Sequence, residues 1–348
     1  MSVSQAVLPS FFITLASFPI LNLIAKKWGI VDKPGGRKIH DKETPLTGGI
    51  AIGIVLISMY FFSPFVFYQY WPLLSAGALL MLIGLIDDIY DIPAWVRLFF
   101  QSIAALIAIY GQNLRIDTLG DILLLGQIDL GIFSVPITLF AILAGINALN
   151  LSDGIDGLAG GLVLIPLSFL AFLSFHAGLD KMFIFILYIC SAILSFLMMN
   201  FRFPWQKQAR VFLGDAGSTV LGFLLACLLI ESSQGNEALI EPVSALWLFV
   251  VPLIDTASVI SKRVLSKKNV FSASRDHLHH LLLSTGLGVT ESVIAIYGIA
   301  FVGGLIATQL VDVHEALRFF SFNLLLVIYI ATPISYAIFF AKQRTKSS

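Results

Sequence analysis

Residues 212–230 read FLGDAGSTVLGFLLACLLI, an apolar run that carries a single charge, Asp215, close to its start. A helix needs about 20 apolar residues to cross the hydrocarbon core of a bilayer, so this run is long enough to span a membrane. Similar runs occur along the whole chain, at about 4–25, 46–67, 70–86, 95–111, 133–150, 158–175, 182–200, 243–260, 291–310 and 319–341. The sequence therefore predicts about 11 transmembrane helices.

The composition also indicates a membrane protein. Hydrophobic residues make up 58% of the 348 residues and charged residues only 12%, and the mean hydropathy is +0.92. A soluble protein of this length could not bury so much apolar surface, whereas a bilayer is itself an apolar solvent. We expect residues 1–348 to form a single membrane-embedded domain of the all-α class, a polytopic integral membrane helical bundle. The formal net charge is zero, which argues against a nucleic-acid partner.

The lysines and arginines predict how the chain is oriented. When the loops between the runs are assigned alternately to two sides, all 21 basic residues except Arg115, Lys181 and Arg318 fall on one side. Cytoplasmic loops are enriched in lysine and arginine, so we expect the N-terminus outside and the C-terminus inside. On the outer side, residues 114–130 interleave apolar residues with Gly and Asp, a pattern that suits a short external β-hairpin.

Aspartates gather at the predicted cytoplasmic ends of the helices. Asp87 and Asp88 end the third run, Asp153 and Asp156 follow the fifth, and Asp215 opens the eighth. An aspartate at the centre of a membrane costs roughly 2.5–3.5 kcal/mol, and converging carboxylates repel one another unless a cation neutralises them. Oxygen ligands of this kind suit Mg²⁺, with Mn²⁺ as the alternative.

Each of these aspartates also has a simpler interpretation. Residues 84–93, GLIDDIYDIP, would place Asp87 and Asp91 on one helical face, but they could equally form a solvated helix end that stops before Pro93. Asp215 could ligate a metal, or it could only cap the helix that it begins. Both interpretations remain open for each segment.

The segment 147–161, NALNLSDGIDGLAGG, carries the stronger signal. Asn147, Asn150 and Asp153 recur every three residues, and glycines then release the backbone into a turn. Glycines let the main chain approach a ligand closely. A capped helix end followed by a flexible turn is the alternative, although it does not require two asparagines and two aspartates.

Histidines are concentrated in residues 274–281, SRDHLHHL, which hold three of the six in the chain. A zinc site is one interpretation, but imidazoles beside Arg275 suit a phosphate-rich ligand better. Earlier in the chain, Arg37, Lys38 and His40 stand close together. They could hold an anionic head group, or they could serve only as a cytoplasmic positive charge.

Taken together, four motifs in this order resemble those of the polyprenyl-phosphate N-acetylhexosamine-1-phosphate transferases. The motifs are Asp87-Asp88-x-x-Asp91, Asn147-x-x-Asn150-x-x-Asp153-Gly-x-Asp156-Gly-Leu, Gly214-Asp215-x-Gly217-Ser218 and His277-x-His279-His280. The histidine motif preceded by Arg275, the Arg37-Lys38-x-His40 element and the 243–255 region are similar to the WecA branch. In the MraY branch a TPTMGG element is usual, whereas residues 44–49 here read TPLTGG.

This resemblance implies roles for individual residues. It implies catalytic roles for Asp87, Asp88, Asp153 and Asp156. It implies Mg²⁺ ligation by Asp215, with Asn150 and Asp88 nearby. It implies that the substrates are bound by Lys38, His40, Asn147, Asn200, Arg275, His277, His279 and His280.

The resemblance also implies a reaction and a setting. N-acetylglucosamine 1-phosphate would pass from UDP-GlcNAc to undecaprenyl phosphate in the bacterial inner membrane, with the active site cytoplasmic, as the first membrane step of cell-surface polysaccharide synthesis. The lipid bilayer is the expected environment, and a homodimer stays open. Three alternatives remain: a UDP-MurNAc-pentapeptide phosphotransferase, an intramembrane aromatic prenyltransferase and an ion-coupled transporter.

Overall fold

The computed structural model describes residues 3–32, 43–267 and 276–344, and most of this chain is helical. Two short strands, β1 (Val31–Asp32) and β2 (Thr44–Pro45), pair antiparallel. A 3-10 turn, η1 (Gly131–Phe133), precedes α5. The helices are α1 (Val3–Trp28), α2 (Gly48–Phe62), α3 (Pro64–Tyr90), α4 (Ala94–Gly111), α5 (Ser134–Ser152), α6 (Leu158–His176), α7 (Asp180–Asn200), α8 (Gly214–Ser233), α9 (Pro242–Leu248), α10 (Val250–Leu265), α11 (Leu278–Ser284), α12 (Val289–Gln309) and α13 (Glu315–Arg344).

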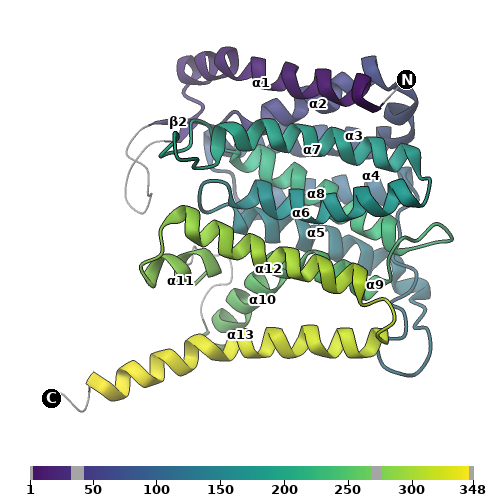
Figure 1. Ribbon diagram of the computed structural model, residues 1–348, viewed down its shortest axis with the longest axis vertical. Helices are drawn as coiled ribbons and strands as arrows, with labels where there is room; N and C mark the ends of the chain where they lie inside the picture. The colour runs from purple at the N-terminus through teal and green to yellow at the C-terminus, as the bar shows by residue number, and fades with distance from the viewer. Residues whose placement is uncertain (1–2, 33–42, 268–275, 345–348) are drawn as a thin grey trace.

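The helices confirm the predicted class of fold. Among the described residues, nine helices are long and apolar enough to cross a membrane: α1, α3 to α8, α12 and α13. The helices α9 and α10 form a further candidate span that is bent by 82°, and α2 is a shorter apolar helix of 15 residues. These segments coincide with the eleven predicted runs, and they lie side by side as a bundle (Figure 1).

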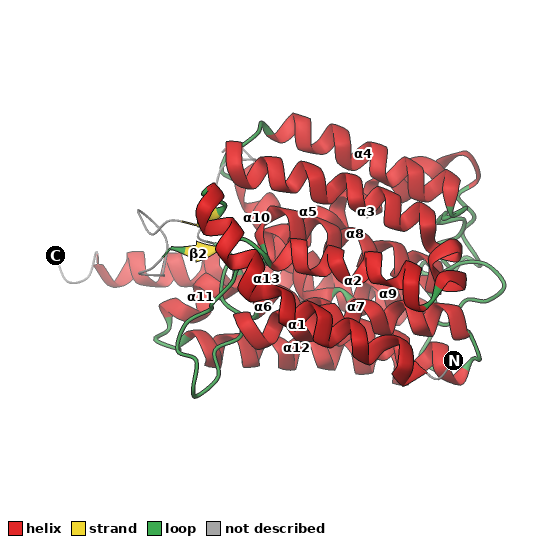
Figure 2. Ribbon diagram, turned by 90° about the horizontal axis from the view of Figure 1, so that it is seen from above, coloured by secondary structure: helices red, strands yellow, loops and turns green. Residues whose placement is uncertain are grey.

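The helix α8 lies in the middle of the bundle (Figure 2), and its residues from Ala216 to Ile230 are all buried. Glycines allow its start to lie very close to two neighbours. A Cβ added at Gly49 of α2 would lie 2.5 Å from the backbone nitrogen of Gly217, and one added at Gly84 of α3 would lie 2.4 Å from the Cα of Ala216. Small residues at such crossings let membrane helices pack backbone to backbone. The start of α8 is therefore fixed between α2 and α3.

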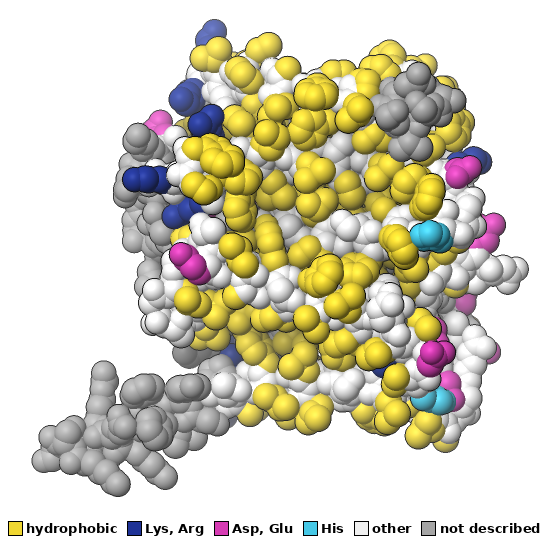
Figure 3. Space-filling view, in the orientation of Figure 1, with side chains coloured by type: hydrophobic (Ala, Val, Ile, Leu, Met, Phe, Trp, Pro, Cys, Tyr) yellow, Lys and Arg dark blue, Asp and Glu magenta, His cyan; other side chains and the backbone are white. Residues whose placement is uncertain are grey.

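Successive spans run in opposite directions when α9 and α10 are counted as one bent span, so the bundle has two distinct ends. The end that carries β1, β2 and α11, here called the α11 end, collects the ends of α3, α5, α7 and α10 and the starts of α4, α6 and α8. In the space-filling view a broad apolar band separates the two ends (Figure 3). Most of the visible lysines and arginines lie toward the α11 end, and the acidic and histidine side chains lie mainly toward the opposite end.

The hairpin predicted near 114–130 forms only in part. Its two arms meet at one isolated antiparallel bridge, between Thr118 and Asp129, and the N–H of Leu119 donates to the carbonyl of Ile128 at 3.0 Å. The side chain of Gln234 accepts hydrogen bonds from the backbone of this loop and donates one back to the carbonyl of Thr118. The segment is thus fastened to the end of α8 by a side chain, and its own strands are too short for a ladder.

Candidate active site

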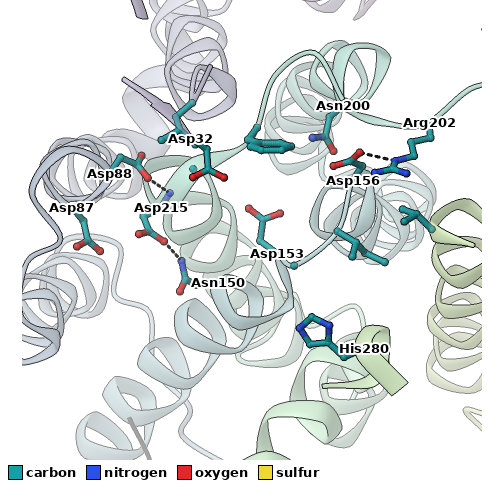
Figure 4. Close-up of a pocket in the computed structure, with 16 residues that line it drawn as sticks. Asp32, Asp87, Asp88, Asn150, Asp153, Asp156, Asn200, Arg202, Asp215 and His280 are labelled. Atoms are coloured by element: carbon teal, nitrogen blue, oxygen red, sulfur yellow. Dashed lines mark hydrogen bonds and ion pairs between the residues drawn. The ribbon is translucent and has the colours of Figure 1, made fainter. Parts of the chain in front are cut away.

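A pocket of about 490 Å³ opens at the α11 end of the bundle. It brings together residues that lie far apart in the sequence, from the ends of α3, α5 and α7, the start of α8, and α11 (Figure 4). Five aspartates of the predicted motifs line it, with polar side chains from the neighbouring elements: Asp87, Asp88, Asp153, Asp156, Asp215, Asp32, Asn150, Asn200, Arg202 and His280.

The carboxylate of Asp88 caps α8 from another helix. Its Oδ1 accepts the N–H of Asp215 at 2.8 Å, and its Oδ2 accepts the N–H of Ala216 at 3.4 Å. The sequence allowed Asp215 to cap the start of α8, but in the structure Asp88 is the capping residue. The carboxylate of Asp215 therefore faces the pocket. There its Oδ1 accepts a hydrogen bond from the amide Nδ2 of Asn150 at 2.6 Å.

The carboxylate of Asp87 forms an ion pair with an arginine side chain. It is buried and lies 2.6 Å from the guanidinium of Arg97 in α4, and it also accepts the backbone N–H of Ile92 at 2.8 Å. The expected shared face of Asp87 and Asp91 is not formed. Asp91 ends α3 in the left-handed conformation, with φ of 50°, because Pro93 follows and the helix cannot continue.

The oxygen atoms around Asp215 have the chemistry of a site for a hard divalent cation. Asn150 uses its Nδ2 for Asp215 and for Ser218, so its Oδ1 remains free to accept. Within the described residues, no three His, Cys, Asp or Glu side chains group tightly enough to hold an ion by themselves. Mg²⁺ commonly binds through one or two carboxylates, with water and substrate phosphates as the other ligands, and Asp215, Asn150 and Asp88 fit that pattern.

Asp153 and Asp156 occupy the turn between α5 and α6. Asp153 points into the pocket (Figure 4). Although its side chain is exposed to the pocket, the protein atoms that surround it reduce its hydration, and this effect and then the three neighbouring carboxylates raise its pKa to about 7. Full ionisation of this cluster near neutral pH would therefore require a positive partner. Asp156 already has one, because its Oδ2 lies 2.7 Å from the Nε of Arg202.

Asn200 and Arg202 organise this turn from the end of α7. Asn200 is buried; its Oδ1 accepts the N–H of Gly157 at 2.6 Å, and its Nδ2 donates to the carbonyl of Val211 at 2.8 Å. Gly157 has φ of 89°, which favours glycine. Arg202 was not predicted as a site residue. No spacing in the sequence connects it to Asp156, and its position two residues after Asn200 is the only signal available.

The histidine motif divides between the pocket and the protein interior. His280 lines the pocket, whereas His277 and His279 are buried behind it. Their rings stack nearly parallel at 5.7 Å. Burial, and then the neighbouring imidazoles, lower the pKa of His279 to about 3, so this ring is neutral at physiological pH. It packs directly against Gly154.

Of the four remaining predicted residues, only Asn147 lies in the described part of the chain. Asn147 faces a separate cavity of about 20 Å³ behind Asp215, where its Nδ2 donates to Gln101 at 2.8 Å. It is thus a neighbour of the site and does not line the main pocket. Lys38, His40 and Arg275 fall outside the described residues.

Comparisons with known proteins agree with this geometry. The family model described as glycosyl transferase family 4 matches residues 70–233, which include all the pocket carboxylates from Asp87 to Asp215. The undecaprenyl-phosphate alpha-N-acetylglucosaminyl 1-phosphate transferase of Escherichia coli (strain K12) is 32% identical over 296 residues, 85% of this chain and 80% of the relative. The probable undecaprenyl-phosphate N-acetylglucosaminyl 1-phosphate transferase of Bacillus subtilis (strain 168) is 32% identical over 92% of this chain and 88% of the relative.

The matches to the relatives extend over most of both chains, and the family model covers the pocket residues from Asp87 to Asp215. They give no support to the transporter alternative, because the family and the relatives are transferases. The polytopic helical architecture, the clustered carboxylates and the matched sequence together lead to one conclusion: the chain belongs to glycosyl transferase family 4.

Proposed function

We propose that the chain transfers N-acetylglucosamine 1-phosphate from UDP-GlcNAc to undecaprenyl phosphate, giving undecaprenyl-pyrophosphoryl-GlcNAc and UMP. The observation that carries this proposal is the pocket in which α3, the α5–α6 turn and α8 present five motif aspartates. The names of the relatives add the acceptor and the transferred sugar phosphate.

The reaction requires two anionic substrates to meet. An oxygen of the lipid phosphate attacks the β-phosphorus of the UDP-sugar and forms the new pyrophosphate bond. The bond from that phosphorus to the bridging oxygen breaks, and UMP leaves with the oxygen. Phosphoryl transfer is accelerated mainly by positioning and by neutralisation of charge.

We propose Mg²⁺, with Mn²⁺ as the alternative, as the cofactor held by Asp215, Asn150 and Asp88. A bound divalent ion neutralises charge on the diphosphate and on the leaving UMP. The chain's own residues prepare this site. Asp88 fixes the start of α8, so the carboxylate of Asp215 faces the pocket beside the amide of Asn150. Arg97 fixes the carboxylate of Asp87 at the edge of the same cluster.

The α5–α6 turn is the proposed contact for the donor. Its shape is set by Asn200 and by Arg202, which hold the backbone of Gly157 and the carboxylate of Asp156. His280 reaches the pocket from α11 on the other side. These groups surround the space next to Asp153, and they are suited to bind the nucleotide and the sugar.

We further propose that the pocket opens to the cytoplasm of a bacterial cell, with the N-terminus of the chain outside. Of the described lysines and arginines, only Arg115, Lys181 and Arg318 lie at the end of the bundle opposite the pocket. The positive-inside rule makes the pocket end cytoplasmic. A homodimer stays a prediction.

The direct test is release of UMP by the purified full-length protein in detergent with Mg²⁺, undecaprenyl phosphate and a panel of UDP-sugars. We expect UMP release and a lipid-linked product with UDP-GlcNAc, and little with UDP-MurNAc-pentapeptide. Preference for the pentapeptide donor would replace the proposed substrate. Absence of UMP release from every UDP-sugar would refute the proposal itself.

A further inference from the structure

A buried carboxylate in α10 lies outside the acidic cluster of the pocket. Asp255 is only 4% exposed, and it receives hydrogen bonds from two other segments. Its Oδ2 lies 2.8 Å from the Nδ1 of His277, and its Oδ1 accepts the N–H of Leu278 at 2.8 Å. The hydroxyl of Tyr329 in α13 donates to the same Oδ1 at 3.0 Å.

The contacts with His277 and Leu278 fix the start of α11. This helix has only seven residues, too few to be stable through its own hydrogen bonds. Asp255 provides an acceptor for its first N–H, as a capping side chain would. As a carboxylate, Asp255 can only accept hydrogen bonds, so His277 must carry a proton on Nδ1. The carboxylate thus sets both the position of α11 and the protonated nitrogen of His277.

The position of α11 in turn fixes the side of the pocket formed by the histidines. His279 packs on Gly154, in the turn that carries Asp153, and His280 lines the pocket itself. The rings of His279 and His280 are in contact, with centroids 4.3 Å apart. A shift of α11 would therefore move His280 and the α5–α6 turn together.

We infer that Asp255 is a positioning residue of the donor site: through His277 and the start of α11, its carboxylate holds His280 and the turn of Asp153 in place. The inference rests on the proposed function, because the donor is the UDP-sugar of that reaction. Asp255 does not line the pocket, so its effect is indirect. Tyr329 connects the same carboxylate to α13.

The test is Asp255→Asn in the full-length protein, with kinetics for both substrates. Asparagine has nearly the same size as aspartate and keeps one oxygen acceptor. Its amide, however, presents an N–H donor to His277, whereas the carboxylate accepts a hydrogen bond from Nδ1 of His277. We expect kcat/KM for UDP-GlcNAc to fall about ten- to a hundred-fold, the scale of one hydrogen bond to a charged group. The KM for undecaprenyl phosphate and the Tm should stay close to the wild-type values. Asp117→Asn, which alters a hydrogen-bonded carboxylate at the opposite end of the bundle, is the matched control.

A double variant shows whether the effect passes through His277. If it does, Asp255→Asn should cost little further activity in a His277→Ala background. Unchanged donor kinetics in Asp255→Asn, equal losses for both substrates, or additive losses in the double variant would overturn the inference.

Failure of the proposed function has a different signature. Wild-type protein that releases no UMP from any UDP-sugar would refute the function, and the positioning role would then be tested by hydrogen exchange of residues 278–284. Faster exchange in Asp255→Asn than in the wild type and in Asp117→Asn would support the role. Equal exchange in the three proteins would overturn it.

Discussion

Replacing Gly154 by alanine would force apart the histidine motif and the turn that carries Asp153. The added Cβ would lie 2.2 Å from Nε2 and 2.5 Å from Cε1 of His279, whereas ordinary van der Waals contacts begin at 3.4 Å. One of the two segments must therefore move by about 1 Å. The ring has little freedom to turn aside, because it is buried and packs between His277 and His280.

The expected consequence is a loss of activity with the fold preserved. A displacement of about 1 Å in a catalytic site can reduce the rate roughly 100-fold. Gly154 does not adopt a positive φ, so the alanine itself meets no backbone strain. Initial rates of UMP release from UDP-GlcNAc, measured beside the Tm, would show this. Gly298→Ala in α12, where a Cβ meets nothing within 4 Å, is the control and should behave as the wild type. Activity within two-fold of wild type in Gly154→Ala would mean that the two segments do not act as one unit.

Three further predictions test the site, the topology and the buried imidazole. Asp215→Asn should abolish Mg²⁺-dependent transfer in a protein that still inserts and folds, and near-normal activity with unchanged Mg²⁺ dependence would contradict its role as a ligand. A reporter fused after Ser348 should be cytoplasmic and one inserted near Gly235 external, and the reverse result at either place would mean that one span is miscounted. Below about pH 6.5 the unfolded chain protonates His279, whereas the folded ring, with a pKa of about 3, stays neutral, so stability should fall as the pH falls from 7 toward 4. His279→Gln should weaken this dependence in thermal unfolding, and identical pH profiles for the two proteins would contradict the buried neutral state.

The sequence predicts the number and positions of the helices well, because the thickness of a bilayer sets the length of each apolar run. It does not predict the break at Phe249, where α9 and α10 meet at 82°. The run 243–260 is apolar on both sides of that residue, so its hydropathy contains no sign of the bend. The partial hairpin is a similar case, since hydrogen bonds that its backbone donates to Gln234, more than a hundred residues away, take the place of strand pairing.

The sequence was sufficient to predict which end of the bundle holds the candidate site. Alternation of the spans brings the ends of α3 and α5 and the start of α8 to one side, and the motif aspartates come with them. The orientation of single side chains was not predictable. Three histidines within four positions look equivalent in sequence, yet only His280 lines the pocket. The histidine that faces the pocket is determined by the rotation of α11 about its axis. The contact of His277 with Asp255, 22 residues earlier in the chain, fixes this rotation.

The hydrogen bonds at the pocket also explain why a divalent cation suits this site. A free helix N-terminus carries partial positive charge and commonly binds phosphate, but here the starts of α8 and α11 already donate to Asp88 and Asp255. The guanidinium groups of Arg97 and Arg202 also form ion pairs, Arg97 with Asp87 and Arg202 with Asp156. Within the described part of the pocket, carboxylates therefore already neutralise these positive groups. A diphosphate entering this space needs additional positive charge, and an ion held by Asp215, Asn150 and Asp88 would supply it.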